Sequence, residues 1–283
     1  MASPHAEGRP GKEIGGAIPR FSWKSSLVIL VVLGATGWSV VGTGFNLLEL
    51  LTSGDPVGRF LSGMFPPDLS GAALQATGTG IMETFQMSLL GAIIGSIVAF
   101  PLAALGTRQN VLVGSSRTYR ALLSIPYHLS RFLTNVFRSV PDILWALIFV
   151  VALGLGPFPG TLALAVHSAG VLGKLYGETL EAVPSRPVNA LHSTGASGLG
   201  LFLFGRLPQA MSGFTSLTLY MWESNIRSAT ILGFVGAGGI GQQILVSMQL
   251  FNYSRLATLV AATVVLVLLV DRLSAAIRKR LVN

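Results

Sequence analysis

The sequence predicts an all-α integral membrane protein with about six transmembrane helices. Hydrophobic residues make up 51% of the 283 residues and charged residues only 11%, whereas soluble domains carry about 25% charged residues. The mean hydropathy is +0.66, and the apolar residues come in long blocks separated by short basic or Gly/Pro-rich stretches. Such blocks are typical of helices that cross a bilayer, because each crossing needs about 20 apolar residues.

Six blocks are long enough to be membrane spans. They cover residues 27–45, 80–105, 132–155, 158–176, 213–234 and 254–271. Residues 1–25 are polar and basic and are expected to form a cytoplasmic N-terminal arm. A cleaved signal is the alternative, but the arm is long and the first block is nearer a span than a short signal core. Residues 26–283 are then the transmembrane domain.

The basic residues indicate how the chain is oriented. If the N-terminus is cytoplasmic, all Lys and Arg residues except Arg59, Arg227 and Arg255 fall on the arm or at cytoplasmic span ends. This asymmetry is the positive-inside bias of helical membrane proteins. Both termini are therefore expected in the cytoplasm, and residues 46–79 on the outer face. Residues 116–133, in which arginines interrupt an apolar pattern, are expected to form an interfacial helix.

The most informative segment is the loop of residues 178–208, which is too long and too patterned to be a simple connector. Pro187 can open a short helix at its first position, and Gly195 can end that helix in the left-handed conformation. A second short helix is predicted from about Ala196 to Arg206, before Pro208. Two short helices on the membrane face would offer a surface for another protein. An ordinary helical hairpin is the alternative.

The loop resembles the cytoplasmic EAA loop of ABC importer permeases. Residues 189–191, Gly195 and the Leu207-Pro208 pair stand at the spacing of that loop, although Asn189 occupies the position where the family usually has Glu. The resemblance implies that the loop couples the chain to an ATPase subunit. The coupling residues it implies are Asn189, Ala190, Leu191, Gly195, Ala196, Leu207 and Pro208.

Further stretches look like phosphonate-type permeases, which import phosphonates, phosphite or phosphate. They are residues 83–87, 138–150, 153–158, 167–174, 225–230 and 233–239. The resemblance implies a type I importer permease in a bacterial inner membrane, surrounded by lipid and moving its substrate by alternating access. It also implies three kinds of partner: a second copy of the chain, two ATP-binding cassette subunits, and an extracytoplasmic substrate-binding protein.

Polar residues inside the apolar blocks are candidates for the translocation path, because a charge at mid-bilayer costs ~2.5–3.5 kcal/mol unless it pairs or lines a polar cavity. Glu223 and Arg227 stand four residues apart and are expected to pair on one helix face. Either the pair is structural or it also lines the path. Arg138 and Asp142 repeat the spacing near the cytoplasmic side. The candidate path residues are Glu83, Asp142, His167, Glu223, Asn225, Arg227, Gly236, Gly238 and Gly239.

Residues 236–241 spell the G-x-G-x-x-G pattern of dinucleotide-binding loops. That mechanism needs a preceding strand and an acidic residue ~20 positions later, and the sequence offers neither. The glycines are instead expected to let the chain leave helical geometry near the outer face, where the N–H groups of such a turn can bind anions. Close helix packing is the alternative role.

Several function classes are excluded or disfavoured. No P-loop motif occurs, so ATP and Mg²⁺ must be bound by a partner, and this chain is expected to bind no cofactor and to have no enzymatic activity by itself. It has no cysteine, and its histidines lack metal-ligand spacing. The net charge of +8 comes without a basic nucleic-acid-binding patch. An ion-gradient-driven secondary transporter using Glu83, Glu223 and Arg227 is the alternative function.

Overall fold

The computed structural model describes residues 23–48, 54–108, 117–196 and 198–282. Every element in these ranges is helical, which confirms the predicted all-α class. The chain divides into two compact units, residues 1–58 and 59–283. The first unit holds α1 (Trp23–Gly42), in which no residue is buried. The predicted N-terminal arm lies almost entirely outside the described residues.

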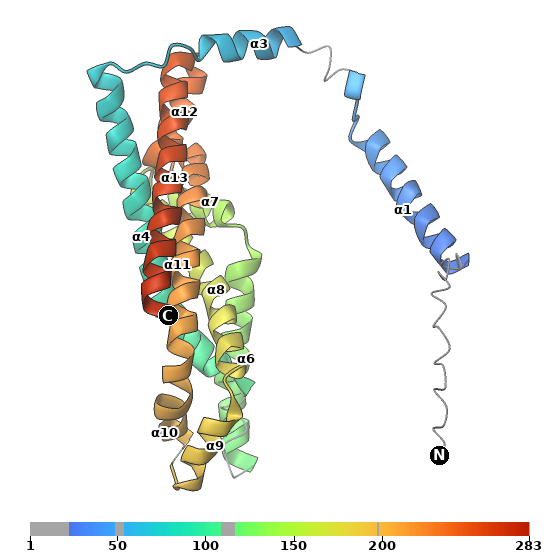
Figure 1. The fold of residues 1–283 in the computed structure, drawn as a ribbon, viewed down its shortest axis with the longest axis vertical. Helices are drawn as coiled ribbons and strands as arrows, with labels where there is room; N and C mark the ends of the chain where they lie inside the picture. The colour runs from blue at the N-terminus through green and yellow to red at the C-terminus, as the bar shows by residue number, and fades with distance from the viewer. Residues whose placement is uncertain (1–22, 49–53, 109–116, 197, 283) are drawn as a thin grey trace, which may run out of the picture. The chain divides into compact units, whose positions relative to one another are not determined.

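The second unit is a helical bundle that α3 enters from the boundary. Its elements are α3 (Gly54–Gly63), α4 (Gly71–Gly106), α6 (Arg117–Ser139), α7 (Asp142–Leu153), α8 (Pro157–Glu181), α9 (Ser185–Ser193), α10 (Gly198–Gly200), the π-helical η1 (Leu201–Arg206), α11 (Leu207–Leu232), the 3-10 helix η2 (Gly233–Val235), α12 (Gly239–Gln249) and α13 (Tyr253–Val282). Helices α4, α8, α11 and α13 run side by side, and α9 and α12 lie at opposite ends (Figure 1). These ends are called the α9 end and the α12 end below.

Three described helices are by themselves long and apolar enough to cross a membrane: Trp23–Gly42, Gly71–Gly106 and Tyr253–Arg280. Two bent helix pairs bring the number of candidate spans to five. The sixth predicted span, residues 158–176, corresponds to α8. This helix packs against α4, α6, α7 and α11, so most of its surface meets protein and it can carry polar residues that a lipid-facing span could not.

The predicted span over residues 132–155 is not one straight helix. It is broken after Ser139, where Ser124–Ser139 and Asp142–Leu153 meet at 90°. Pro141 stands immediately before α7, and the residue before a proline is driven out of helical geometry. The predicted interfacial helix of residues 116–133 is also not separate, because α6 runs through from Arg117 to Ser139.

Glycines allow α8 to approach its neighbours closely. A Cβ added at Gly95 of α4 would lie 2.5 Å from the Cβ of Ser168, and one at Gly91 would lie 2.7 Å from the Cβ of Leu164. Small residues four positions apart are the usual means of close helix contact in membranes. On the other side of α8, a Cβ at Gly170 would lie 2.5 Å from the backbone N of Arg138.

Gly170→Ala is therefore expected to destabilise the bundle by ~1–3 kcal/mol, because α6 must move away from α8. Thermal unfolding of the detergent-solubilised protein measures the effect. Gly177→Ala on the same helix is the matched control, since a Cβ there meets nothing within 4 Å. Equal melting temperatures for the two variants would show that the α6–α8 contact is not tight.

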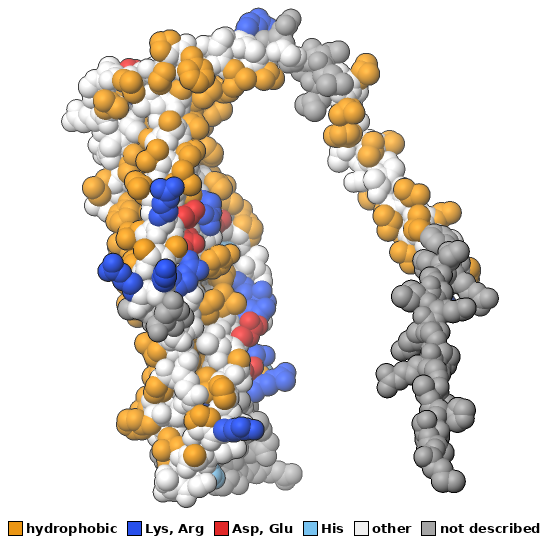
Figure 2. All heavy atoms as spheres, viewed as in Figure 1, with side chains coloured by type: hydrophobic (Ala, Val, Ile, Leu, Met, Phe, Trp, Pro, Cys, Tyr) orange, Lys and Arg blue, Asp and Glu red, His pale blue; other side chains and the backbone are white. Residues whose placement is uncertain are grey.

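The surface of the bundle is divided into apolar and charged zones. Figure 2 shows hydrophobic and uncharged side chains over most of the part nearest α12, and most charged side chains from the middle of the bundle toward α9. Large apolar side chains are exposed on the outside of several helices, among them Ile97 of α4, Val151 of α7 and Leu269 of α13. A multi-pass membrane protein exposes such surfaces to lipid.

Candidate functional site

The predicted loop of residues 178–208 forms a helical knob at the α9 end (Figure 1). Its first helix is α9, which begins at Ser185, so Pro187 is its third residue and not its first as predicted. The predicted left-handed glycine is confirmed, because Gly195 has a φ of +83°. Val188 is buried, and a Cβ at Gly205 of η1 would contact it at 3.6 Å. Val188 therefore anchors α9 on the following segment.

The second helix predicted in the loop, from about Ala196 to Arg206, does not end before Pro208. Residues 198–206 make the short α10 and one π-helical segment that passes directly into α11, so Leu207 and Pro208 lie inside a continuous helical run. The backbone N–H of Leu207 donates to Phe202 O, five residues back. Pro208 has no N–H to donate to the carbonyl four residues earlier, and a π turn accommodates such a gap without ending the helix.

The knob presents an apolar surface with a shallow hollow. The hollow lies between α9 and the start of α11 and is lined by Pro187, Ala190, Leu191, Thr194, Phe204, Gly205 and Gln209. Asn189 and Ala190 are exposed, and the side chains of Leu199 and Phe204 are 69% and 77% exposed. Exposed large apolar groups beside a concavity are typical of protein interaction sites.

The predicted pairing of Glu223 with Arg227 is wrong. Glu223 instead binds Arg278 of α13, with an Nη2–Oε1 distance of 2.6 Å, and Arg227 binds Asp271 at 3.6 Å. The Glu223 side chain is 13% exposed, whereas Arg227 and Asp271 are almost half exposed. Because α11 and α13 pack side by side, Glu223 and Arg227 each form an ion pair with a residue of α13 and not with each other.

Asn225 joins three helices at the centre of the bundle. Its side chain is 1% exposed. Its Nδ2 donates to Ser168 Oγ of α8 at 3.0 Å and to Ser88 O of α4 at 3.5 Å. One helical position before Ser168, His167 is partly buried, and its Nδ1 has no hydrogen-bond partner among the described residues. The structure therefore places the predicted path residue Asn225 against α8 and α4 through Ser168 and Ser88, and no hydrogen bond between Asn225 and His167 is found in the part of the chain that the structure describes.

Glu83 and the glycine-rich turn are brought together at the α12 end. Gly236, Gly238 and Gly239 have positive φ angles of 87°, 78° and 72°, which confirms that the chain leaves helical geometry there. The N–H of Gly239 donates to Glu83 Oε2 at 2.9 Å, and the next N–H, of Ile240, donates to Thr84 Oγ1 at 2.9 Å. The N–H groups of this turn were expected to bind an anion. Instead, the carboxylate of Glu83 accepts from one of them and caps the N-terminus of α12.

The i, i+4 partners Arg138 and Asp142 are also separated, because the 90° bend lies between them. The Asp142 carboxylate accepts from the N–H of Ile143 at the start of α7. Arg138 instead donates through Nε and Nη2 to Asn135 Oδ1, at 3.2 and 2.9 Å. Its guanidinium points toward a cleft that the sequence did not indicate.

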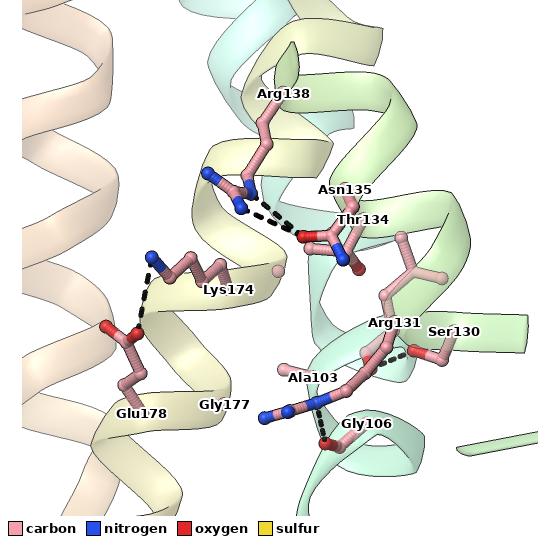
Figure 3. Close-up of a pocket in the computed structure, with 12 residues that line it drawn as sticks. Ala103, Gly106, Ser130, Arg131, Thr134, Asn135, Arg138, Lys174, Gly177 and Glu178 are labelled. Carbon is pink, nitrogen blue, oxygen red and sulfur yellow. Dashed lines mark hydrogen bonds and ion pairs between the residues drawn. The ribbon is translucent and has the colours of Figure 1, made fainter. Parts of the chain in front are cut away.

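This cleft, called the basic cleft, lies between α4, α6 and α8 and has a volume of about 280 Å³ (Figure 3). Three cations line it: Arg131, Arg138 and Lys174. Lys174 pairs with Glu178 at 3.6 Å and Arg131 with Glu181 at 3.7 Å. In the sequence these cations indicate the orientation of the spans, and Arg138 also has the i, i+4 spacing to Asp142, but no local pattern places the three together. Within the described ranges, no three His, Asp or Glu side chains gather as a metal site.

Comparison with known proteins places the chain in a family. Residues 111–283 match the family described as binding-protein-dependent transport system inner membrane component. HtxC of Stutzerimonas stutzeri, which is named for phosphite transport, is 36% identical over 90% of this chain and 85% of its own length. The phosphite transport system permease protein PtxC of the same organism is 33% identical over 91% of this chain and 90% of its own length.

The fold has a solved counterpart. A chain of an inward-facing structure of the MetNI methionine ABC transporter superposes with a TM-score of 0.64 at 22% identity, covering 76% of this chain and all of that chain. This likeness supports the helical arrangement described above. The family match over residues 111–283 and the similarity to HtxC and PtxC establish that the chain belongs to the binding-protein-dependent transport system inner membrane components, the permease subunits of ABC importers.

Proposed function

We propose that the chain is the permease of an ATP-driven importer that moves a phosphorus oxyanion, namely phosphite, a phosphonate or phosphate. The observation that carries the proposal is the similarity, over about nine-tenths of the chain, to PtxC and HtxC. A further relative of 32% identity, of which this chain covers 44%, is the phosphate-import permease protein PhnE of Mycolicibacterium smegmatis. The three names share a tetrahedral phosphorus anion as cargo.

In the proposed assembly, two copies of the chain form the path and each docks one ATPase subunit through its knob at the α9 end. A binding protein delivers the anion at the α12 end, so the α9 end and both termini face the cytoplasm. The exposed Leu199 and Phe204 support the docking role, because an isolated bundle gains nothing by exposing them to water. The continuous helix from η1 into α11 would carry movement of the knob to Asn225 and the bundle core.

Alternating access then follows from the packing around α8. The tight glycine contacts of α8 with α4 and α6 favour motion of the helices as rigid groups, since packed interfaces do not deform continuously. Two copies that rock against each other open the path first toward the α12 end and then toward the α9 end. The predicted path residues on α8 and α11, His167 and Asn225 among them, would lie near this path.

Proteoliposomes containing the permease, its ATPase and its binding protein test the proposal. We expect uptake of labelled phosphite, methylphosphonate or phosphate. This uptake should require all three proteins, and it should require ATP inside the proteoliposomes, where the ATPase lies. Sulfate is the matched control anion. Uptake that persists without ATP but follows an imposed proton gradient would contradict the proposal and favour a secondary transporter.

A further inference from the structure

The basic cleft carries more positive charge than its own carboxylates neutralise. Arg131, Arg138 and Lys174 line it together with one carboxylate, Glu178. Glu181 adjoins it through Arg131. Arg108 lies beside Glu181, to which its backbone N–H donates at 3.1 Å. A hydrogen bond to Tyr127 and the charge of Glu181 raise the pKa of Arg108; Arg108 does not line the cleft, but its positive charge lies beside Glu181.

Arg138 is the cation best placed to hold an anion. Among the described residues no carboxylate lies within salt-bridge distance of it, and its Nε and Nη2 converge on one neutral oxygen, Asn135 Oδ1. A guanidinium has five donors in a planar fork that matches the oxygens of phosphate-like anions. In Figure 3 the guanidinium of Arg138 and the ammonium of Lys174 lie on the same side of the cleft, on α6 and α8.

Small residues leave room for a ligand next to these cations. The lining includes Gly106, Gly173 and Gly177, and a Cβ at Gly177 would meet nothing within 4 Å. Ser130 and Thr134 also line the cleft, and the Ser130 hydroxyl donates to Leu102 O. Lys174 and Glu178 lie on the same face of α8 as His167, because positions seven and eleven residues apart in a helix point in similar directions.

We propose that the basic cleft binds a phosphorus oxyanion, held by Arg138 and Lys174, at the end of the bundle from which the imported anion leaves. The identity of the anion rests on the proposed function; the cleft's preference for a small tetrahedral anion rests on its charge and size. The phosphate of an anionic lipid has the same chemistry, so the experiment separates free anion from lipid.

The permease–ATPase complex is placed in nanodiscs of phosphatidylcholine alone, without ATP or binding protein, and titrated with phosphite by isothermal calorimetry. Saturable binding is expected. Arg138→Gln and Lys174→Gln should each weaken it about tenfold or more, because each removes a charge-assisted hydrogen bond. Glu178→Gln should tighten it. Arg272→Gln and Lys279→Gln, exposed cations of α13, are the matched controls and should leave it unchanged.

Failure of saturable binding, or equal affinity in the Arg138→Gln and parent complexes, would overturn the proposal. So would nanodiscs containing phosphatidylglycerol in which this lipid binds through Arg138 and phosphite does not displace it. Melting temperatures of the variants show whether loss of binding is loss of fold. ATP-driven uptake by the parent proteoliposomes is measured separately. If the transporter imports the anion but shows no saturable phosphite binding, this inference is refuted and the proposed function is not.

Discussion

Replacing Ala190 by aspartate is expected to reduce ATP-driven uptake by more than about 100-fold while the helical bundle stays folded. Ala190 is exposed on α9 and lines the hollow of the knob. In the proposed assembly this surface is covered by the ATPase, and an unpaired carboxylate buried there costs several kcal/mol. The bundle core does not contain Ala190, so the melting temperature should change little.

Uptake and ATP hydrolysis are measured together in proteoliposomes. The variant is expected to lose uptake and the stimulation of ATP hydrolysis by the loaded binding protein. Ser185→Asp at the start of the same helix is the control, because a carboxylate at a helix N-terminus is stabilising. An Ala190→Asp variant that transports at the parent rate would mean that the ATPase does not cover the knob.

Glu223→Gln is expected to destabilise the protein by ~1–3 kcal/mol, because it removes the charge partner of Arg278, whose side chain is 34% exposed. Glu223 meets Arg278 at 2.6 Å and is 13% exposed. The Arg278 Nε is already buried without a partner among the described residues, and Ser274 Oγ, at 3.3 Å, is the other acceptor that Arg278 Nη2 reaches. Chemical unfolding in detergent measures the loss.

The second ion pair between the same two helices is the control. Arg227 and Asp271 are 3.6 Å apart and 49% and 43% exposed, so Asp271→Asn should cost ~1 kcal/mol or less. A double replacement of Glu223 and Arg278 by leucine should recover much of the stability lost in Glu223→Gln. Equal destabilisation by Glu223→Gln and Asp271→Asn would contradict the burial argument.

The elements predicted correctly from the sequence are those that local chemistry determines. The apolar blocks mark α4 and α13 because lipid-facing helices must be apolar along their length. Gly195 and the glycines of residues 236–239 mark departures from helical geometry because only glycine adopts positive φ without strain. The helix predicted at Pro187 is present as α9, which begins at Ser185, whereas the coupling role of residues 178–208 stays a prediction.

The elements predicted wrongly depend on partners that are distant in the sequence. Glu223 and Arg227 have the right local spacing, but α13 supplies Arg278 and Asp271 from more than forty residues away. Pro141 breaks the helix before α7, but no local signal gives the 90° angle between α6 and α7, both of which pack against α8. The basic cleft is built by α4, α6 and α8 together, so no single stretch of sequence carries its signal.

The central claim is that the knob of residues 178–208 is where the ATPase engages. The chain has no cysteine, so Asn189→Cys carries a single benzophenone label on exposed α9, and Gln249→Cys carries one at the α12 end. After illumination of the assembled transporter, the Asn189 label is predicted to capture the ATPase subunit and the Gln249 label is not. An active transporter in which the Asn189 label fails to capture the ATPase would contradict the claim.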